Sequence, residues 1–262
     1  MNQFEIRELK KIDFRDAVVL DGFPSVGLVS SIVSNYLVTL LRLEYVGFID
    51  SPNFPAVTVI RDAIPMAPAR LYARGDVQPN DTQIAIFTSE FQPHTDINKA
   101  LGEKIIQWAI DNRCKLIVSV GGLVIEREVD EKNEAAAEAS EVAVYGIAST
   151  PRARKYLEAS DVEPFMEGVI TGTSGILLRE GKKRGFDVVV LLTEARQNIA
   201  DAKASVLLMA AIDQMVLKMN LELGPLIKEA EALEEQLKIL KKDADLKAKS
   251  QQPQNNQPEG YS

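Results

Sequence analysis

Short runs rich in β-branched and aromatic residues alternate along the chain with longer stretches in which apolar residues recur every three or four positions. The short runs are typical of buried strands and lie at 17–20, 44–50, 56–60, 69–74, 83–88, 115–120, 142–149 and 187–193. The longer stretches predict helices at 25–41, 94–112, 150–159, 176–185 and 201–219. This alternation predicts a three-layer α/β/α sandwich with a mainly parallel sheet.

The stretch 17–41 reads as a strand, a turn and a helix, and the rest of the chain is organised around it. Gly22, Phe23 and Pro24 form the turn, Ser25 is the expected N-cap, and Gly27 leaves room beside the helix N-terminus. Unpaired N–H groups there can hold an anion. No GxGxxG occurs here and no GxxxxGK[ST] occurs in the chain, so these glycines either serve close packing or border a ligand or partner surface at the strand end.

A second glycine-rich turn, at 168–175, repeats this logic. We expect a short strand, a turn capped by Thr173 or Ser174, and a helix closed by Gly185. Two further glycines end the strand at 115–120, and a glutamate follows the strand at 187–193. The candidate ligand or partner surface at these strand ends therefore comprises Gly22, Phe23, Pro24, Gly27, Gly121, Gly122, Gly172, Gly175 and Glu194.

The C-terminal region departs from this pattern, so residues 1–222 are assigned to the α/β/α domain. Residues 223–250 predict a helix that starts at Gly224-Pro225 and carries the seam of a short coiled coil, formed by Leu226, Leu233, Leu237 and Leu240. A narrow seam requires a partner helix, from another copy, another protein or its own domain. Residues 251–262 are polar and contain proline, which predicts a disordered tail.

Composition narrows the function classes. The net charge of −8 and the pI near 5.0 disfavour nucleic acid as a partner. The single cysteine, Cys114, excludes an internal disulfide framework, and no signal peptide or membrane span is apparent, so a cytoplasmic protein is expected. A single histidine, His94, makes a histidine metal site or a Ser-His-Asp triad hard to build. We predict no metal, no cofactor and no catalytic residue.

Five segments in order carry a resemblance to a known family. GFPSVGLVSSIVSNYLV, the strand ending in Gly121-Gly122, VYGIAST, GVITGTSGILL and VVVLLTEA together resemble the proteasome assembly chaperone 2 family over roughly residues 17 to 222. The resemblance implies an α/β/α domain with nucleoside-phosphorylase-like topology that is used for protein–protein contact. It also implies assembly into homo-oligomers or heterodimers.

Within that family the chain is most similar to the archaeal branch, whose members bind the proteasome core particle through a C-terminal hydrophobic residue, a tyrosine and any residue. This chain ends in Gly260, Tyr261 and Ser262, so the tyrosine matches and Gly260 departs from the pattern. A glycine there lacks an apolar contact worth about 1 to 2 kcal/mol. The resemblance implies a non-enzymatic, chaperone-like or activator-like partner of the core particle.

The sequence is also compatible with two other functions. An enzyme could bind a nucleoside, a nucleotide or phosphate at the glycine-rich turns, with Glu90 or Glu194 as the acid/base group at a strand end. A purely structural protein could use the leucine seam to hold its subunits together.

Overall fold

The computed structural model describes residues 4–75, 82–124, 143–197, 200–228 and 232. Nine strands form one sheet in the order β1-β3-β6-β7-β2-β8-β11-β9-β10. They are β1 (Glu5–Glu8), β2 (Val18–Gly22), β3 (Glu44–Asp50), β6 (Ala69–Ala73), β7 (Ile84–Ser89), β8 (Leu116–Leu123), β9 (Val144–Ala148), β10 (Glu163–Pro164) and β11 (Val188–Glu194).

The sheet is mixed, which corrects the expectation of a mainly parallel one. Its centre, β7-β2-β8-β11, is parallel, as is the short β9–β10 pair. The β1–β3, β3–β6, β6–β7 and β9–β11 pairs are antiparallel. An apolar run shows that a strand is buried but carries no mark of its direction, so the sequence pattern did not reveal the reversed strands.

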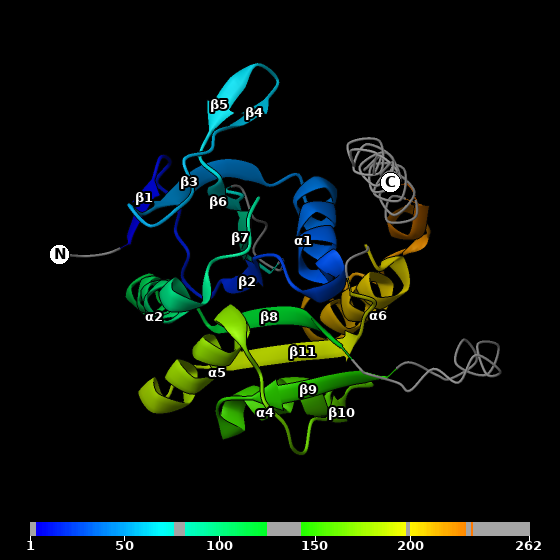
Figure 1. Ribbon diagram of the computed structural model, residues 1–262. Helices are drawn as coiled ribbons and strands as arrows, with labels where there is room; N and C mark the ends of the chain where they lie inside the picture. Colours follow the sequence, from blue (N-terminus) through cyan, green and yellow to red (C-terminus); the bar gives the residue numbers. More distant parts are fainter. Residues whose placement is uncertain (1–3, 76–81, 125–142, 198–199, 229–231, 233–262) are drawn as a thin grey trace, which may run out of the picture.

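Helices cover both faces of this sheet (Figure 1), as a sandwich requires. α1 (Val29–Leu40) and α6 (Ala202–Ile212) lie on one face, and α2 (Thr95–Asp111) and α5 (Gly172–Arg184) lie on the other. Val18 and Leu20 of β2 belong to the core with α1 and α6, whereas Val19 belongs to the core with α2 and α5. Burial on both faces explains why the central strands read as continuous apolar runs.

Two side chains cap the predicted helices at 150–159 and 201–219. Thr150 accepts a hydrogen bond from the Ala153 N–H at the start of α4 (Pro151–Glu158), and Asp201 accepts one from the Ala204 N–H at the start of α6. The C-cap Gly185 has a φ of 66°, so its predicted role at the end of α5 is also confirmed.

Two local predictions were wrong. α1 begins at Val29, after the 3-10 turn η1 (Val26–Leu28), and not directly after Ser25. The N-cap of α5 is Thr171, two residues before the expected cap, and residues 168–170 form no strand. The edge of β9 that faces away from β11 pairs with β10, which lies between α4 and residue 168 in the chain.

The end of the described chain packs on its own domain. α6 continues into a π-helical segment, η2 (Asp213–Leu217), and residues 224–228 form a helical turn. Leu226 of that turn is completely buried in the core with α1 and α6, so it serves its own domain and not a partner helix. The rest of the predicted leucine seam (Leu233, Leu237 and Leu240) and the tail 251–262 lie outside the described residues.

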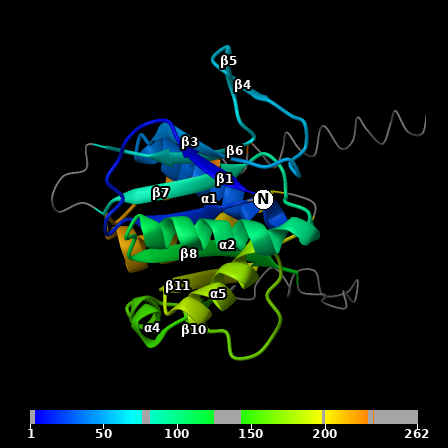
Figure 2. The ribbon, with the colours of Figure 1, turned by 90° about the vertical axis from the view of Figure 1, so that its left-hand side faces the viewer.

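A two-stranded hairpin, β4 (Val59–Arg61) and β5 (Ile64–Met66), projects from the body between β3 and β6 (Figures 1 and 2). Ile60 of β4 and Ile64 of β5 are exposed apolar residues, and so is Val57, two residues before β4. In the part of the chain that the structure describes, no helix is long and apolar enough to cross a membrane.

Candidate functional site

The carboxyl ends of the four central strands meet at one edge of the sheet, where α/β folds commonly bind ligands. A cavity of about 340 Å³ opens there, and we call it the strand-end pocket. Its walls come from the ends of β2, β8 and β11, the segment after β7, and the N-terminal turns of α2 and α5. α2 and α5 pack together on the same face of the sheet, which places their N-terminal turns side by side.

The structure brings together part of the predicted strand-end surface. The predicted residues that line the pocket are Phe23, Pro24, Gly121, Gly122 and Gly172. Those that do not line it are Gly22, Gly27, Gly175 and Glu194. Three of the six predicted glycines therefore line the pocket, namely Gly121, Gly122 and Gly172.

Glycines outside the pocket allow close packing. A Cβ atom on Gly22 would lie 2.1 Å from the Ser34 hydroxyl oxygen, and one on Gly175 would lie 2.2 Å from the Ile170 carbonyl oxygen. Gly27 has a φ of 66°, in the left-handed region that favours glycine. These three positions support the packing interpretation of the glycine-rich turns.

Asp21 is the main lining residue that sequence reasoning missed, because it lies between the predicted strand at 17–20 and the glycine-containing turn that follows. Its side chain is 4% exposed, and this burial raises its pKa from 3.8 to about 6. One carboxyl oxygen accepts a hydrogen bond from the Phe23 N–H at 3.2 Å. The signal in the sequence was an acid inside a buried β-branched run, which is rarely tolerated without a partner.

A chain of hydroxyl groups connects Asp21 to α5. The Ser119 hydroxyl oxygen lies 2.7 Å from the second carboxyl oxygen of Asp21 and 2.8 Å from the hydroxyl oxygen of Ser174. Asp21 and Ser119 are in register on the parallel strands β2 and β8, so their side chains lie on the same face. We call Asp21, Ser119 and Ser174 the Asp21 relay.

The remaining polar groups of the pocket come from α2 and α5. The Thr173 hydroxyl donates to the Asn98 side-chain oxygen at 3.4 Å, which joins the two helix N-termini. No lysine, arginine or histidine occurs among the described residues that line the pocket. Across the described ranges, no group of three or more His, Cys, Asp or Glu side chains is placed to hold a metal ion.

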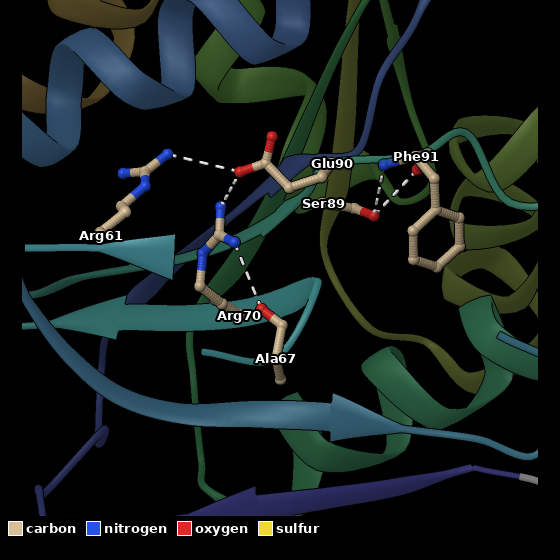
Figure 3. A network of polar contacts seen from close by, with 6 residues as sticks. All are labelled: Arg61, Ala67, Arg70, Ser89, Glu90 and Phe91. Atoms are coloured by element: carbon tan, nitrogen blue, oxygen red, sulfur yellow. Dashed lines mark hydrogen bonds and ion pairs between the residues drawn. The ribbon is translucent and has the colours of Figure 1, made fainter. Parts of the chain in front are cut away.

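Glu90 follows β7 but does not line the pocket, and two arginines pair with it (Figure 3). The Arg70 side chain is 1% exposed, and its guanidinium donates to Glu90 and, at 3.2 Å, to the Ala67 carbonyl. Arg61 of the hairpin donates to the same Glu90 oxygen at 3.4 Å. Neither Glu90 nor Glu194, the acid/base groups of the enzyme hypothesis, therefore lines the pocket.

The hairpin and the pocket lie at the same edge of the sheet. Ala69, the first residue of β6, is paired with Ser89, the last residue of β7. The hairpin immediately precedes β6, so it emerges beside the carboxyl ends of the parallel strands. Arg61 connects it to Glu90 at that edge.

Comparison with known proteins decides the family. The sequence profile of the PAC2 family matches residues 19–241. The chain belongs to the PAC2 family. An uncharacterised protein of Methanocaldococcus jannaschii is similar to it, with 32% identity over 233 residues that cover 89% of each chain. The family expected from the five sequence segments is therefore confirmed.

Solved structures show the same PAC2 architecture. PbaA of Pyrococcus furiosus, described as an archaeal homologue of proteasome-assembly chaperone, is 26% identical to this chain with a TM-score of 0.74. The match covers 94% of this chain and 95% of PbaA. PbaB of Pyrococcus furiosus, an archaeal proteasome activator, matches with 22% identity and a TM-score of 0.73 over 92% of this chain and all of its own. The latter similarity concerns the fold.

Proposed function

We propose that this PAC2 protein is a non-enzymatic partner of the proteasome core particle that acts during its assembly or on the finished particle. The observation that carries this proposal is the match to PbaA over nearly the whole length of both chains, in sequence and in fold. A partner of the core particle works in the same compartment as the particle, so we propose that this protein is cytoplasmic.

The C-terminal residues Gly260, Tyr261 and Ser262 are the proposed docking element, although they lie outside the described residues. A tyrosine side chain can bury its ring in a receptor pocket while its hydroxyl group finds a partner. Several tails on one oligomer would bind with avidity, which offsets the apolar contact that Gly260 lacks.

Co-elution with the proteasome core particle of the same organism tests this proposal. The full-length protein is expected to co-elute, whereas a deletion of Gly260 to Ser262 or Tyr261→Ala is not. Gly260→Leu is expected to strengthen binding by about five- to thirty-fold, because it restores an apolar contact of about 1 to 2 kcal/mol. A rise in peptide hydrolysis in the shared fractions would identify an activator, and unchanged hydrolysis an assembly factor.

Binding that is equal for the full-length and deleted proteins would contradict tail docking and leave the partnership itself supported. The absence of co-elution for all four proteins, Gly260→Leu included, would contradict the partnership.

We also propose that the protein self-associates through its hairpin. Ile60 is paired with Pro65 on one face of the hairpin, and Ile64 is paired with Arg61 on the other, so both faces carry an exposed isoleucine. A two-stranded hairpin of this kind is marginally stable without a cover. A second copy related by a twofold axis supplies one, because identical apolar strands are complementary to themselves.

Light scattering of Ile60→Lys/Ile64→Lys tests self-association. The lysines are expected to reduce the mass per particle toward the 28.9 kDa of a single chain, since each places a charge in the apolar contact. Leu9→Lys is the matched control, because Leu9 is a similarly exposed apolar residue on the body. If the double variant Ile60→Lys/Ile64→Lys has the same particle mass as Leu9→Lys and the unchanged protein, the hairpin is ruled out as the interface.

A further inference from the structure

The strand-end pocket is lined by both polar and apolar side chains, and none of them belongs to the proposed docking tail. Its polar lining residues include Asp21, Asn98, Thr173 and Ser174, whereas Phe23, Pro24, Leu123, Ile170 and Leu192 are apolar. The volume of about 340 Å³ lies at the lower end of the range for small-molecule sites. A ligand that fills this cavity must therefore be small and must combine an apolar surface with polar groups.

The Asp21 relay determines which polar groups the ligand needs. An ionised carboxylate only accepts hydrogen bonds, and the hydroxyl group of Ser119 has a single hydrogen. Ser119 therefore donates to Asp21, and Ser174 donates to Ser119, across the 2.7 Å and 2.8 Å contacts. The lone pairs that remain on the Ser174 oxygen can then accept a hydrogen bond, so Ser174 favours a ligand with a donor group.

The first turn of α5 supplies donors beside this acceptor. Its N-cap, Thr171, makes no side-chain capping hydrogen bond, although Thr171, Gly172 and Thr173 all line the pocket. The backbone N–H groups of a first helical turn have no partner within the helix. Because a hydroxyl group both donates and accepts, it can use the Ser174 oxygen and these N–H groups together.

The charge of the pocket selects against phosphate. Its described lining contains the acid Asp21 and no lysine, arginine or histidine. An anionic ligand would face Asp21 without a cationic side chain to neutralise it. A neutral ligand meets no such repulsion, so the described lining favours a neutral ligand over a nucleotide or phosphate.

We propose that the strand-end pocket binds a neutral, nucleoside-sized molecule whose hydroxyl groups contact Ser174 and the first turn of α5, with an apolar ring against Phe23 and Leu192. This site goes beyond the proteasome partnership, which is independent of it. The ligand sits with its hydroxyl groups toward Ser174, because this oxygen and the first turn of α5 supply the acceptor and the donors that hydroxyl groups need.

Isothermal titration calorimetry of the full-length protein with adenosine and with adenosine monophosphate tests the proposal. Adenosine is expected to bind with a dissociation constant of about 1 mM or lower, and the monophosphate at least about ten-fold more weakly. Ser174→Ala removes the accepting oxygen and is expected to weaken adenosine binding about ten-fold. Ser160→Ala is the matched control, because Ser160 follows α4 and does not line the pocket, and its hydroxyl donates to the Leu157 carbonyl.

Asp21→Asn keeps the test valid if Ser174→Ala fails to fold. Asparagine donates to Ser119 and reverses the direction of the relay, so adenosine binding is again expected to fall about ten-fold or more. Three results would overturn the proposal: no heat with adenosine at about 10 mM, monophosphate binding as tight as adenosine binding, or unchanged affinity in whichever variants fold. None of them bears on co-elution with the core particle.

Discussion

Asp21→Asn is expected to stabilise the protein at pH 8 by up to about 3 kcal/mol, since the folded state no longer holds a buried charge. Burial raises the pKa of Asp21 from 3.8 to about 6. Above both values the folded and unfolded states are ionised, and the full penalty for the buried carboxylate applies. Asparagine avoids this penalty, and it can still accept from Phe23 and donate to Ser119.

The pH dependence identifies the cause of this gain. Between about pH 4 and pH 6 the unfolded state releases the proton of Asp21 while the folded state still binds it, so wild-type stability falls as pH rises through this window. Below pH 4 both states are protonated and the penalty vanishes. Urea unfolding should therefore show a smaller difference between Asp21→Asn and wild type at pH 5 than at pH 8.

Asp62→Asn is the control for this comparison. Asp62 is exposed in the hairpin turn, with a φ of 50° that asparagine also tolerates. A change below about 0.5 kcal/mol is expected at both pH values. If Asp21→Asn were instead less stable than wild type at pH 8, the hydrogen bonds to the carboxylate would outweigh its burial and its pKa would not be raised.

Glu90→Ala is expected to destabilise the protein by about 2 kcal/mol, because it leaves the buried guanidinium of Arg70 without its carboxylate. The Arg70 side chain is 1% exposed and its Nε atom already has no hydrogen-bond partner. Glu90 itself is 43% exposed, so water reduces the loss below the value for a fully buried pair. Urea unfolding at neutral pH measures the difference.

Arg61→Ala is the matched control, since Arg61 pairs with the same carboxylate from an exposed position. Arg61→Ala should lower the free energy of unfolding by less than about 1 kcal/mol. The double variant Arg70→Met/Glu90→Ala is expected to be more stable than Glu90→Ala, because it also removes the unpaired charge. A double variant that is less stable than Glu90→Ala would mean that Arg70 stabilises the fold by packing and not through its ion pair.

The sequence by itself determined the features that depend on residues close together in the chain. The hydroxyl of Thr150 and the carboxylate of Asp201 cap helices that start within three residues of them, and Gly185 supplies a left-handed residue where α5 ends. β2 reads as a buried strand because both of its faces lie in a core. Five segments in order were also enough to establish the PAC2 family.

Only the tertiary structure decided strand direction and the contents of the pocket. Apolar runs look alike in parallel and antiparallel strands. The sequence therefore did not show that β6 is antiparallel to β3 and β7, or that β9 is antiparallel to β11. Asp21 and Ser119 are 98 residues apart, and Ser119 and Ser174 are 55 residues apart. Their contact depends on the register of β2 with β8 and on the position of α5, and a slip of one residue would turn Asp21 to the other face of the sheet.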